Sequence, residues 1–294
     1  MACDEAAGRA WPAGFRGHAA RRPLTSIRFE ASTMLIGCTA YSVRDYFKAG
    51  EMHCLNFAGI MSELGIEALE YHQMFFESWE SDYLAEIRKS AEDVGLPIAC
   101  LGCAGGFCQD DPAQRREDIE VIRDRLLAAS ALGARSIRVQ LGRTGDDAKD
   151  ATVGIQRCID ALNELIPTAK ERGVRIALEN HGGVASRASW ILRVILGTDP
   201  DWVGACPDFG NFPREIRYRE LARVLPYAFH VHAKALHFHA DGEERDTDFA
   251  RVIRMAEDCD CQAVFSIEYE GPGDQFTGVL RTKELIEKYR SSAL

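Results

Sequence analysis

The chain has 294 residues and a formal net charge of -10, from 35 Lys and Arg against 45 Asp and Glu. This acidic balance argues against a nucleic-acid partner, because proteins that bind nucleic acids contact phosphates through basic patches. No apolar run approaches the roughly 18 residues needed to cross a membrane, so we expect no membrane partner. The length suits two mid-sized domains or one α/β barrel of about 250 residues.

The first 33 residues differ from the rest of the chain. They are rich in Ala and Arg and show no sustained hydrophobic period, and the apolar pattern begins abruptly at Met34. We therefore predict that residues 1–33 are a disordered N-terminal extension or result from a mis-assigned start. Residues 34–294 are predicted to form the barrel domain.

Cysteine usage indicates a reducing compartment. The chain has ten cysteines at irregular spacings, whereas a secreted disulfide scaffold is shorter and denser in cysteine. Cys100, Cys103 and Cys108 form a cluster, but no second pair and no histidines follow at the spacing of a zinc site. We expect mainly buried free thiols and a cytoplasmic location.

Short apolar runs alternate with longer amphipathic segments from Met34 onward. The segment 113–132 carries apolar residues at helical spacing. A glycine suited to ending a helix precedes four of the runs, at Gly65, Gly95, Gly133 and Gly173. The eight runs begin near Leu35, Ile66, Ile98, Ser136, Val174, Trp202, Ala228 and Ala263.

Eight strand–helix units of uniform composition predict an α/β fold, a single (β/α)8 TIM barrel. The alternative is an open doubly wound sheet, which usually carries a glycine-rich phosphate turn after its first strand. Residues 39–44, which follow the first run, contain no glycine. This weakens the dinucleotide-binding alternative.

The last four predicted strands end in residues that suit a metal site. Catalytic groups of such barrels lie at the C-terminal strand ends, and here these ends deliver Glu179, Asp208, His232 and Glu268. Three neighbouring carboxylates repel one another unless protons or a cation neutralise them. Carboxylates with one imidazole suit Mn²⁺, Mg²⁺ or Co²⁺, and Zn²⁺ is an alternative. We predict a divalent metal ion, with Mn²⁺ preferred.

Neighbouring residues on the same strands compete for these roles. His230 and His232 share a strand face, and we expect His232 to be the ligand and His230 to be a hydrogen-bonded core residue one layer deeper. Glu270 shares a face with Glu268 and is the second choice there. Arg138 and Arg143 flank the fourth strand end, where we expect surface ion pairs rather than a phosphate site.

Four segments in this order resemble the sugar phosphate isomerase/epimerase family, the xylose-isomerase-like barrels. They are Glu-Asn-His-Gly-Gly at 179–183, Asp-Phe-Gly-Asn at 208–211, His-Val-His-Ala-Lys at 230–234 and Ile-Glu-Tyr-Glu-Gly at 267–271. The resemblance covers roughly residues 34–290. It implies a metal held by the four strand-end residues named above, with Glu179 and Glu268 also exchanging protons with a substrate carbon.

The resemblance also bears on substrate contacts. It implies that His181 and Lys234 contact substrate oxygens. Other strand-end residues are expected to line the substrate site, namely Tyr41, Glu70, His72 and Asn211.

The sequence departs from the ketose 3-epimerases of that family in two places. Those enzymes carry a His where Asn211 stands, and an Arg beyond the metal His where this chain has residues 236–239 without Arg. We expect a metal-dependent isomerase or epimerase of a sugar, keto-sugar or polyol derivative, which abstracts a proton next to an oxygen polarised by the metal. A lyase of the same superfamily, an inosose- or keto-sugar-type dehydratase, is the alternative.

Two other functions are less favoured. An AP endonuclease-like enzyme needs more histidines for its multi-zinc cluster, and the acidic charge counts against DNA. A non-catalytic sugar-binding subunit would not need the complete metal set. We expect a small carbohydrate substrate. The sequence leaves open whether the chain forms a homo-oligomer.

Overall fold

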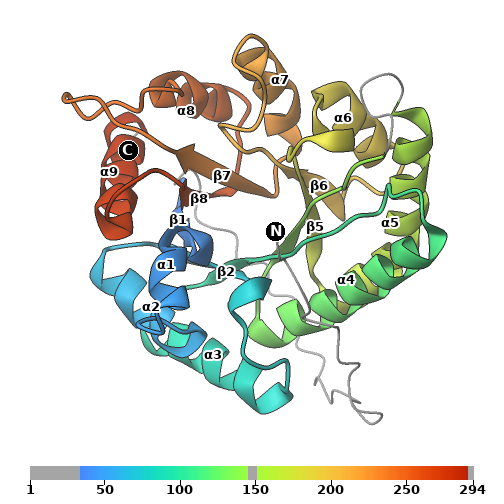
Figure 1. Cartoon of the computed structure of the whole chain (residues 1–294), viewed down its shortest axis with the longest axis horizontal. Coiled ribbons are helices and arrows are strands. Elements are labelled where there is room, and N and C mark those ends of the chain that lie inside the picture. Colours follow the sequence, from blue (N-terminus) through green and yellow to red (C-terminus); the bar gives the residue numbers. More distant parts are fainter. Residues whose placement is uncertain (1–33, 145–150, 291–294) are drawn as a thin grey trace.

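The computed structural model describes residues 34–144 and 151–290. The predicted N-terminal extension, residues 1–33, lies outside the described residues. In the described part, eight parallel strands form the centre of the molecule and helices surround them (Figure 1). This arrangement confirms the predicted (β/α)8 barrel.

Each strand begins at or within two residues of its predicted start, the widest offsets being Ile66 against Ala68 and Ala228 against His230. The strands are β1 (Ile36–Thr39), β2 (Ala68–His72), β3 (Ile98–Gly102), β4 (Ser136–Val139), β5 (Arg175–Glu179), β6 (Val203–Cys206), β7 (His230–Ala235) and β8 (Val264–Tyr269). The helices are α1 (Arg44–Lys48), α2 (Cys54–Glu63), α3 (Ser81–Asp93), α4 (Pro112–Leu132), α5 (Thr152–Arg172), α6 (Ala188–Leu196), α7 (Arg217–Val224), α8 (Phe249–Asp258) and α9 (Gln275–Tyr289).

The barrel closes through a sparse seam between β6 and β7. The other neighbours pair continuously in the order β6-β5-β4-β3-β2-β1-β8-β7. Across the seam, isolated parallel bridges join Ala205 to Ala228 and Asp208 to His232. The backbone N–H of His232 donates to the Pro207 carbonyl at 3.0 Å, and Phe209 N–H donates to the His232 carbonyl at 3.1 Å. Two predicted metal ligands therefore sit opposite each other where the barrel closes.

Glycine ends two of the long helices as predicted. Gly133 after α4 has φ 76° and Gly173 after α5 has φ 68°. A side chain at a left-handed position is strained, so glycine there lets the chain leave the helix and enter the next strand directly.

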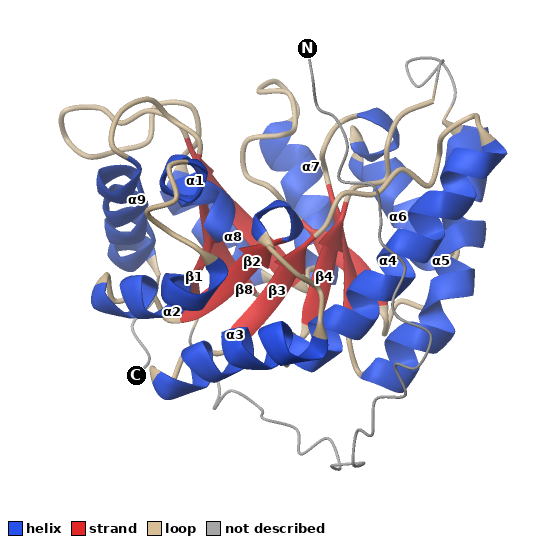
Figure 2. Cartoon of the chain, turned by 60° about the horizontal axis from the view of Figure 1, so that its bottom comes forward, coloured by secondary structure: helices blue, strands red, loops and turns tan. Residues whose placement is uncertain are grey.

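Alternate strand residues separate an apolar layer from a polar interior. Leu69, Leu101 and Ile137 are fully buried in the core that the helices cover, as Figure 2 shows for the strands and their surrounding helices. The intervening Glu70 and Arg138 belong to the polar interior and are also buried. Among the helices of the described residues, none is long and apolar enough to cross a membrane.

The cysteines behave as the sequence predicts. Every cysteine within residues 34–144 and 151–290 is a free thiol. Cys100, Cys103 and Cys108 are fully buried, and burial raises the pKa of Cys103 to about 12. Buried, protonated thiols of this kind act as small apolar side chains.

Candidate metal centre

Four side chains, from β5, β7, β8 and the loop after β6, converge at the C-terminal end of the barrel. We call them the metal cluster: Glu179, Asp208, His232 and Glu268. Each offers one ligand atom, these atoms lie within 4.8 Å of one another, and all four residues are buried. His232 Nδ1 lies 3.3 Å from Glu179 Oε1, 3.6 Å from Glu268 Oε1 and 4.0 Å from Asp208 Oδ2. The structure thus brings together the four residues that the sequence predicts as ligands.

The loop after β6 holds Asp208 in place. Asp208 Oδ1 accepts hydrogen bonds from the backbone N–H groups of Gly210, at 2.7 Å, and Asn211, at 3.0 Å. The Asn180 side chain accepts from Asp208 N–H at 2.6 Å and donates to the Asp208 carbonyl at 3.0 Å. Because these bonds hold Oδ1 in the loop, Oδ2 faces the other residues of the metal cluster. Asn180 is not among the predicted site residues, although it lies next to the predicted ligand Glu179.

Two carboxylate oxygens of the cluster accept no hydrogen bond. They are Asp208 Oδ2 and Glu268 Oε2, and both are buried. The Lys234 ammonium lies 3.3 Å and 3.1 Å from them, which is an electrostatic contact without hydrogen-bond geometry. Lys234 supplies part of the positive charge that such buried oxygens need. An orphaned oxygen pair beside an imidazole fits a divalent cation, so this cluster could bind a metal ion.

Electrostatics within the cluster also favour a cation. Burial raises the pKa of Asp208 well above its ordinary range, and Lys234 only partly opposes this shift. Burial alone would also raise the pKa of Glu179, but the Arg138 guanidinium, 3.6 Å away, holds that pKa well below its usual range. The three carboxylates therefore do not all ionise together without an added positive charge.

Three predicted substrate residues border the cluster. Asn211 Nδ2 donates to Glu179 Oε1 at 3.4 Å, and Lys234 Nζ donates to Asn211 Oδ1 at 3.1 Å. His181 Nδ1 lies 3.4 Å from Glu179 Oε2, and its side chain is 46% exposed. Lys234 also contacts Glu270 at 3.1 Å, which places that second-choice ligand outside the cluster. Substrate contact by Asn211, Lys234 and His181 stays a prediction.

Tyr41 and His72 lie together at the ends of β1 and β2. Their ring centroids are 5.6 Å apart. Burial and the nearby Arg138 lower the pKa of His72 to about 3, so its imidazole is neutral. Both side chains are half-buried, and their contact with substrate stays a prediction.

The structure places Glu70 against two histidines. Its side chain is fully buried and its carboxylate lies against two imidazoles of β7, and its contact with substrate stays a prediction. His230 Nε2 is 2.9 Å from Glu70 Oε2, and His232 Nε2 is 3.0 Å from Glu70 Oε1. His230 is accordingly the buried, hydrogen-bonded histidine that the strand alternation predicts.

The expectation of a surface ion pair at Arg138 is wrong. Arg138 is 3% exposed, its Nη1 donates to the Cys103 carbonyl at 3.1 Å, and it neighbours Glu179. Arg138 follows Ser136 with strand alternation, which is the sequence signal for an inward side chain. Arg143 is exposed on the loop after β4, and its surface ion pair stays a prediction.

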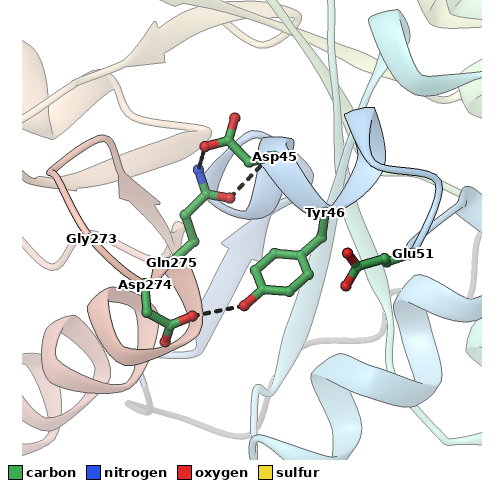
Figure 3. Close-up of a pocket in the computed structure, with 6 residues that line it drawn as sticks. All are labelled: Asp45, Tyr46, Glu51, Gly273, Asp274 and Gln275. Atoms are coloured by element: carbon green, nitrogen blue, oxygen red, sulfur yellow. Dashed lines mark hydrogen bonds between the residues drawn. The ribbon is translucent and has the colours of Figure 1, made fainter.

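A shallow pocket lies beside the barrel, away from the metal cluster. It joins the segment after β1 to the segment after β8, and its lining residues are Asp45, Tyr46, Glu51, Gly273, Asp274 and Gln275 (Figure 3). Tyr46 donates to Asp274 at 2.7 Å, and Gln275 Nε2 donates to Asp45 at 3.0 Å. These bonds tie α1 to the start of α9, and no predicted site residue lines the pocket.

Comparison with known protein families agrees with the barrel fold. Residues 59–291 match the family described as xylose isomerase-like TIM barrel, so the chain belongs to that family. This confirms the resemblance drawn from the strand-end motifs.

Solved structures with the same fold include a zinc-binding protein and two proteins described as epimerases or isomerases. The IOLI protein with a binding zinc atom is 16% identical, with a TM-score of 0.72 over 88% of this chain and 100% of that chain. The 3-keto-D-glucoside 4-epimerase from E. coli is 16% identical, with a TM-score of 0.70 over 87% and 100%. A sugar phosphate isomerase/epimerase from Parabacteroides distasonis is 17% identical, with a TM-score of 0.61 over 92% and 100%. At these identities the likeness establishes the fold.

Proposed function

We propose that this protein is a divalent-metal-dependent isomerase or epimerase of a sugar, keto-sugar or polyol derivative. The observation that carries the proposal is the metal cluster, with its two buried oxygens that accept no hydrogen bond. Among the solved structures with this fold, one is described as a 3-keto-D-glucoside 4-epimerase, another as a sugar phosphate isomerase/epimerase, and a third binds zinc. Mn²⁺ is the proposed ion, since three carboxylates outnumber one imidazole.

The protein residues divide the chemistry among them. A divalent ion bound in the cluster would polarise a substrate oxygen and stabilise the negative charge that develops when a proton is lost. Glu179 and Glu268 would take the proton from the adjacent carbon and return it. Lys234, His181 and Asn211, which border the cluster, would donate hydrogen bonds to substrate hydroxyls and fix their orientation.

The charge around the cluster favours an uncharged substrate. The carboxylates are Glu70, Glu179, Asp208, Glu268 and Glu270, and the cationic side chains close to them are Arg138 and Lys234. With a divalent ion bound, His232 neutral and all five acids ionised, these side chains and the ion together still carry one negative charge in excess. A phosphorylated sugar would enter against this field, so we propose a neutral carbohydrate.

Solvent isotope exchange tests the proposed chemistry. The protein would be incubated with Mn²⁺ in deuterated water and screened against ketoses, inososes and keto-glycosides, each with its phosphorylated counterpart where one exists. Deuterium at a single carbon of an unphosphorylated compound is the expected result, with an epimer or isomer as the product. A dehydrated product would instead identify the lyase of the same superfamily.

Matched variants assign the exchange to the site. Glu179→Gln and Glu268→Gln should each lower the exchange rate at least about 100-fold, the scale of one general acid–base group. Glu164→Gln is the control, because Glu164 makes an exposed ion pair with Arg116 at 2.7 Å. Equal exchange in all three variants would refute the assignment of the two glutamates. Sugar binding without exchange of any compound would favour the non-catalytic alternative.

A further inference from the structure

The Glu70 carboxylate contacts two histidines inside the barrel, directly behind the metal cluster. Its oxygens lie 3.0 Å and 3.1 Å from His232 Nε2, and Oε2 lies 2.9 Å from His230 Nε2. Glu70 and both histidines are at most 1% exposed. Water therefore does not compete for these contacts, and the carboxylate depends on the two imidazoles for its hydrogen bonds.

This contact determines which nitrogen of His232 faces the metal cluster. An ionised carboxylate can only accept hydrogen bonds, so His232 Nε2 must carry a proton and donate to Glu70. Nδ1 is then the nitrogen whose lone pair is free in the neutral ring. Nδ1 is also the atom that lies within 4.0 Å of Glu179, Glu268 and Asp208. Metal-binding histidines are commonly oriented by such a carboxylate on the other ring nitrogen.

The backbone around Glu70 is shaped to hold its carboxylate in this position. The pairing of β2 with β3 is irregular between Leu69 and Glu70, and such irregularities re-aim side chains. Across from it, Gly102 leaves the space that the carboxylate needs. A Cβ atom at Gly102 would lie 3.2 Å from Glu70 Oε1 and 3.1 Å from Arg138 Nη2, closer than ordinary contacts.

We propose that Glu70 is a positioning residue that fixes the tautomer and ring orientation of the metal ligand His232. The inference rests on the proposed metal-dependent function and adds to it a residue that contacts neither metal nor substrate. Glu70 would raise metal affinity because His232 does not have to reorient or change tautomer when the ion binds.

Metal affinity and histidine NMR test this role on the full-length protein. Calorimetric titration with Mn²⁺ should give a Kd about 10- to 100-fold weaker in Glu70→Gln than in the wild type. Glu67→Gln is the matched control, because Glu67 lies just before β2 and pairs with Arg290 at 2.9 Å instead of with a histidine. Its Mn²⁺ affinity should equal that of the wild type.

NMR of the wild-type protein needs no Glu70 variant and so remains decisive if Glu70→Gln does not fold. With isotope-labelled histidine, the signal missing from His232→Gln identifies His232. Nε2 should carry a hydrogen-bonded proton both without metal and with Zn²⁺, and Zn²⁺ should bind Nδ1. Coordination of Zn²⁺ through Nε2 of His232 would overturn the proposal.

Two more outcomes separate this inference from the proposed function. If the wild-type protein binds Mn²⁺ and a folded Glu70→Gln variant binds it with the same Kd, the inference alone is overturned. If the wild-type protein binds no metal, both the inference and the proposed function fail.

Glu70 also forms a group with Cys100 and His230 whose donor atoms lie within 4.8 Å of one another. Two ions per chain, with one lost in Cys100→Ser, would show that Glu70 is a ligand and overturn the proposal.

Discussion

Replacing Lys234 with methionine tests whether the metal cluster requires a positive charge for stability. Lys234 Nζ lies 3.1 Å from Glu268, 3.3 Å from Asp208 and 3.1 Å from Glu270, and its side chain is 8% exposed. Removing one partner from a buried ion pair costs about 3–5 kcal/mol. Protonation of Asp208 can absorb part of this loss, so we expect Lys234→Met to destabilise the metal-free protein by about 3 kcal/mol.

Thermal unfolding with and without metal measures the effect. A loss of about 3 kcal/mol lowers the Tm of a chain of this size by about 6–12 °C. Saturation at 100 times Kd adds about 2.7 kcal/mol to any binding-competent protein, and Lys234→Met should gain more at the same Mn²⁺ concentration because no ammonium repels the ion.

An exposed lysine supplies the control for this experiment. Lys170 contacts Asp199 at 2.6 Å with its side chain 48% exposed. Lys170→Met should change stability by at most about 1 kcal/mol, with or without metal. An equal or smaller Mn²⁺-induced rise in Tm for Lys234→Met than for the wild type would refute the reasoning, because the ion would then bind away from the carboxylates that Lys234 contacts.

Asp208, Gly102 and Glu67 each allow a further test by single substitution. Asp208→Asn should abolish the Mn²⁺-induced rise in Tm, because it removes the charge of an oxygen that accepts no hydrogen bond; a full rise would argue against Asp208 as a ligand. Gly102→Ala should lower the free energy of unfolding by about 1–3 kcal/mol, because the added methyl group crowds its neighbours. Gly59→Ala, in open space on α2, should not lower it. Equal effects of the two substitutions in denaturant unfolding would contradict this. Burial would raise the pKa of Glu67, but Arg290 holds it below the ordinary value. The ion pair therefore stabilises the folded protein at pH values above the pKa that Glu67 has in the unfolded chain, and this stabilisation is lost as the pH falls. Glu67→Gln should therefore cost about 1 kcal/mol at pH 7 and progressively less below about pH 4, and a loss that does not depend on pH would contradict the ion pair.

The barrel and the convergence of its ligands could be predicted because both depend on repeated local patterns. Apolar runs mark strands, Gly133 and Gly173 mark helix ends, and parallel strands bring their C-terminal ends to one side of a barrel. The position of Glu179 as the last residue of β5 follows from this rule without any tertiary information.

The contacts of Glu70 and Arg138 could not be predicted because they depend on depth inside the barrel. Strand alternation places both side chains on the inner face but does not say which layer they occupy. The irregular pairing at Glu70 is a contact between strands, which one sequence does not reveal. Arg138 becomes buried because Glu179, contributed by the next strand, balances its charge. Pairings of this kind join residues far apart in the chain.

Anomalous X-ray diffraction from crystals grown with Mn²⁺ tests the central claim most directly. Its signal places the ion without reference to any assumed ligand. We predict one strong peak between Glu179, Asp208, His232 and Glu268, within bonding distance of His232 Nδ1. A metal cluster without a peak at saturating Mn²⁺, or a peak only at Glu70, Cys100 and His230, would contradict the account.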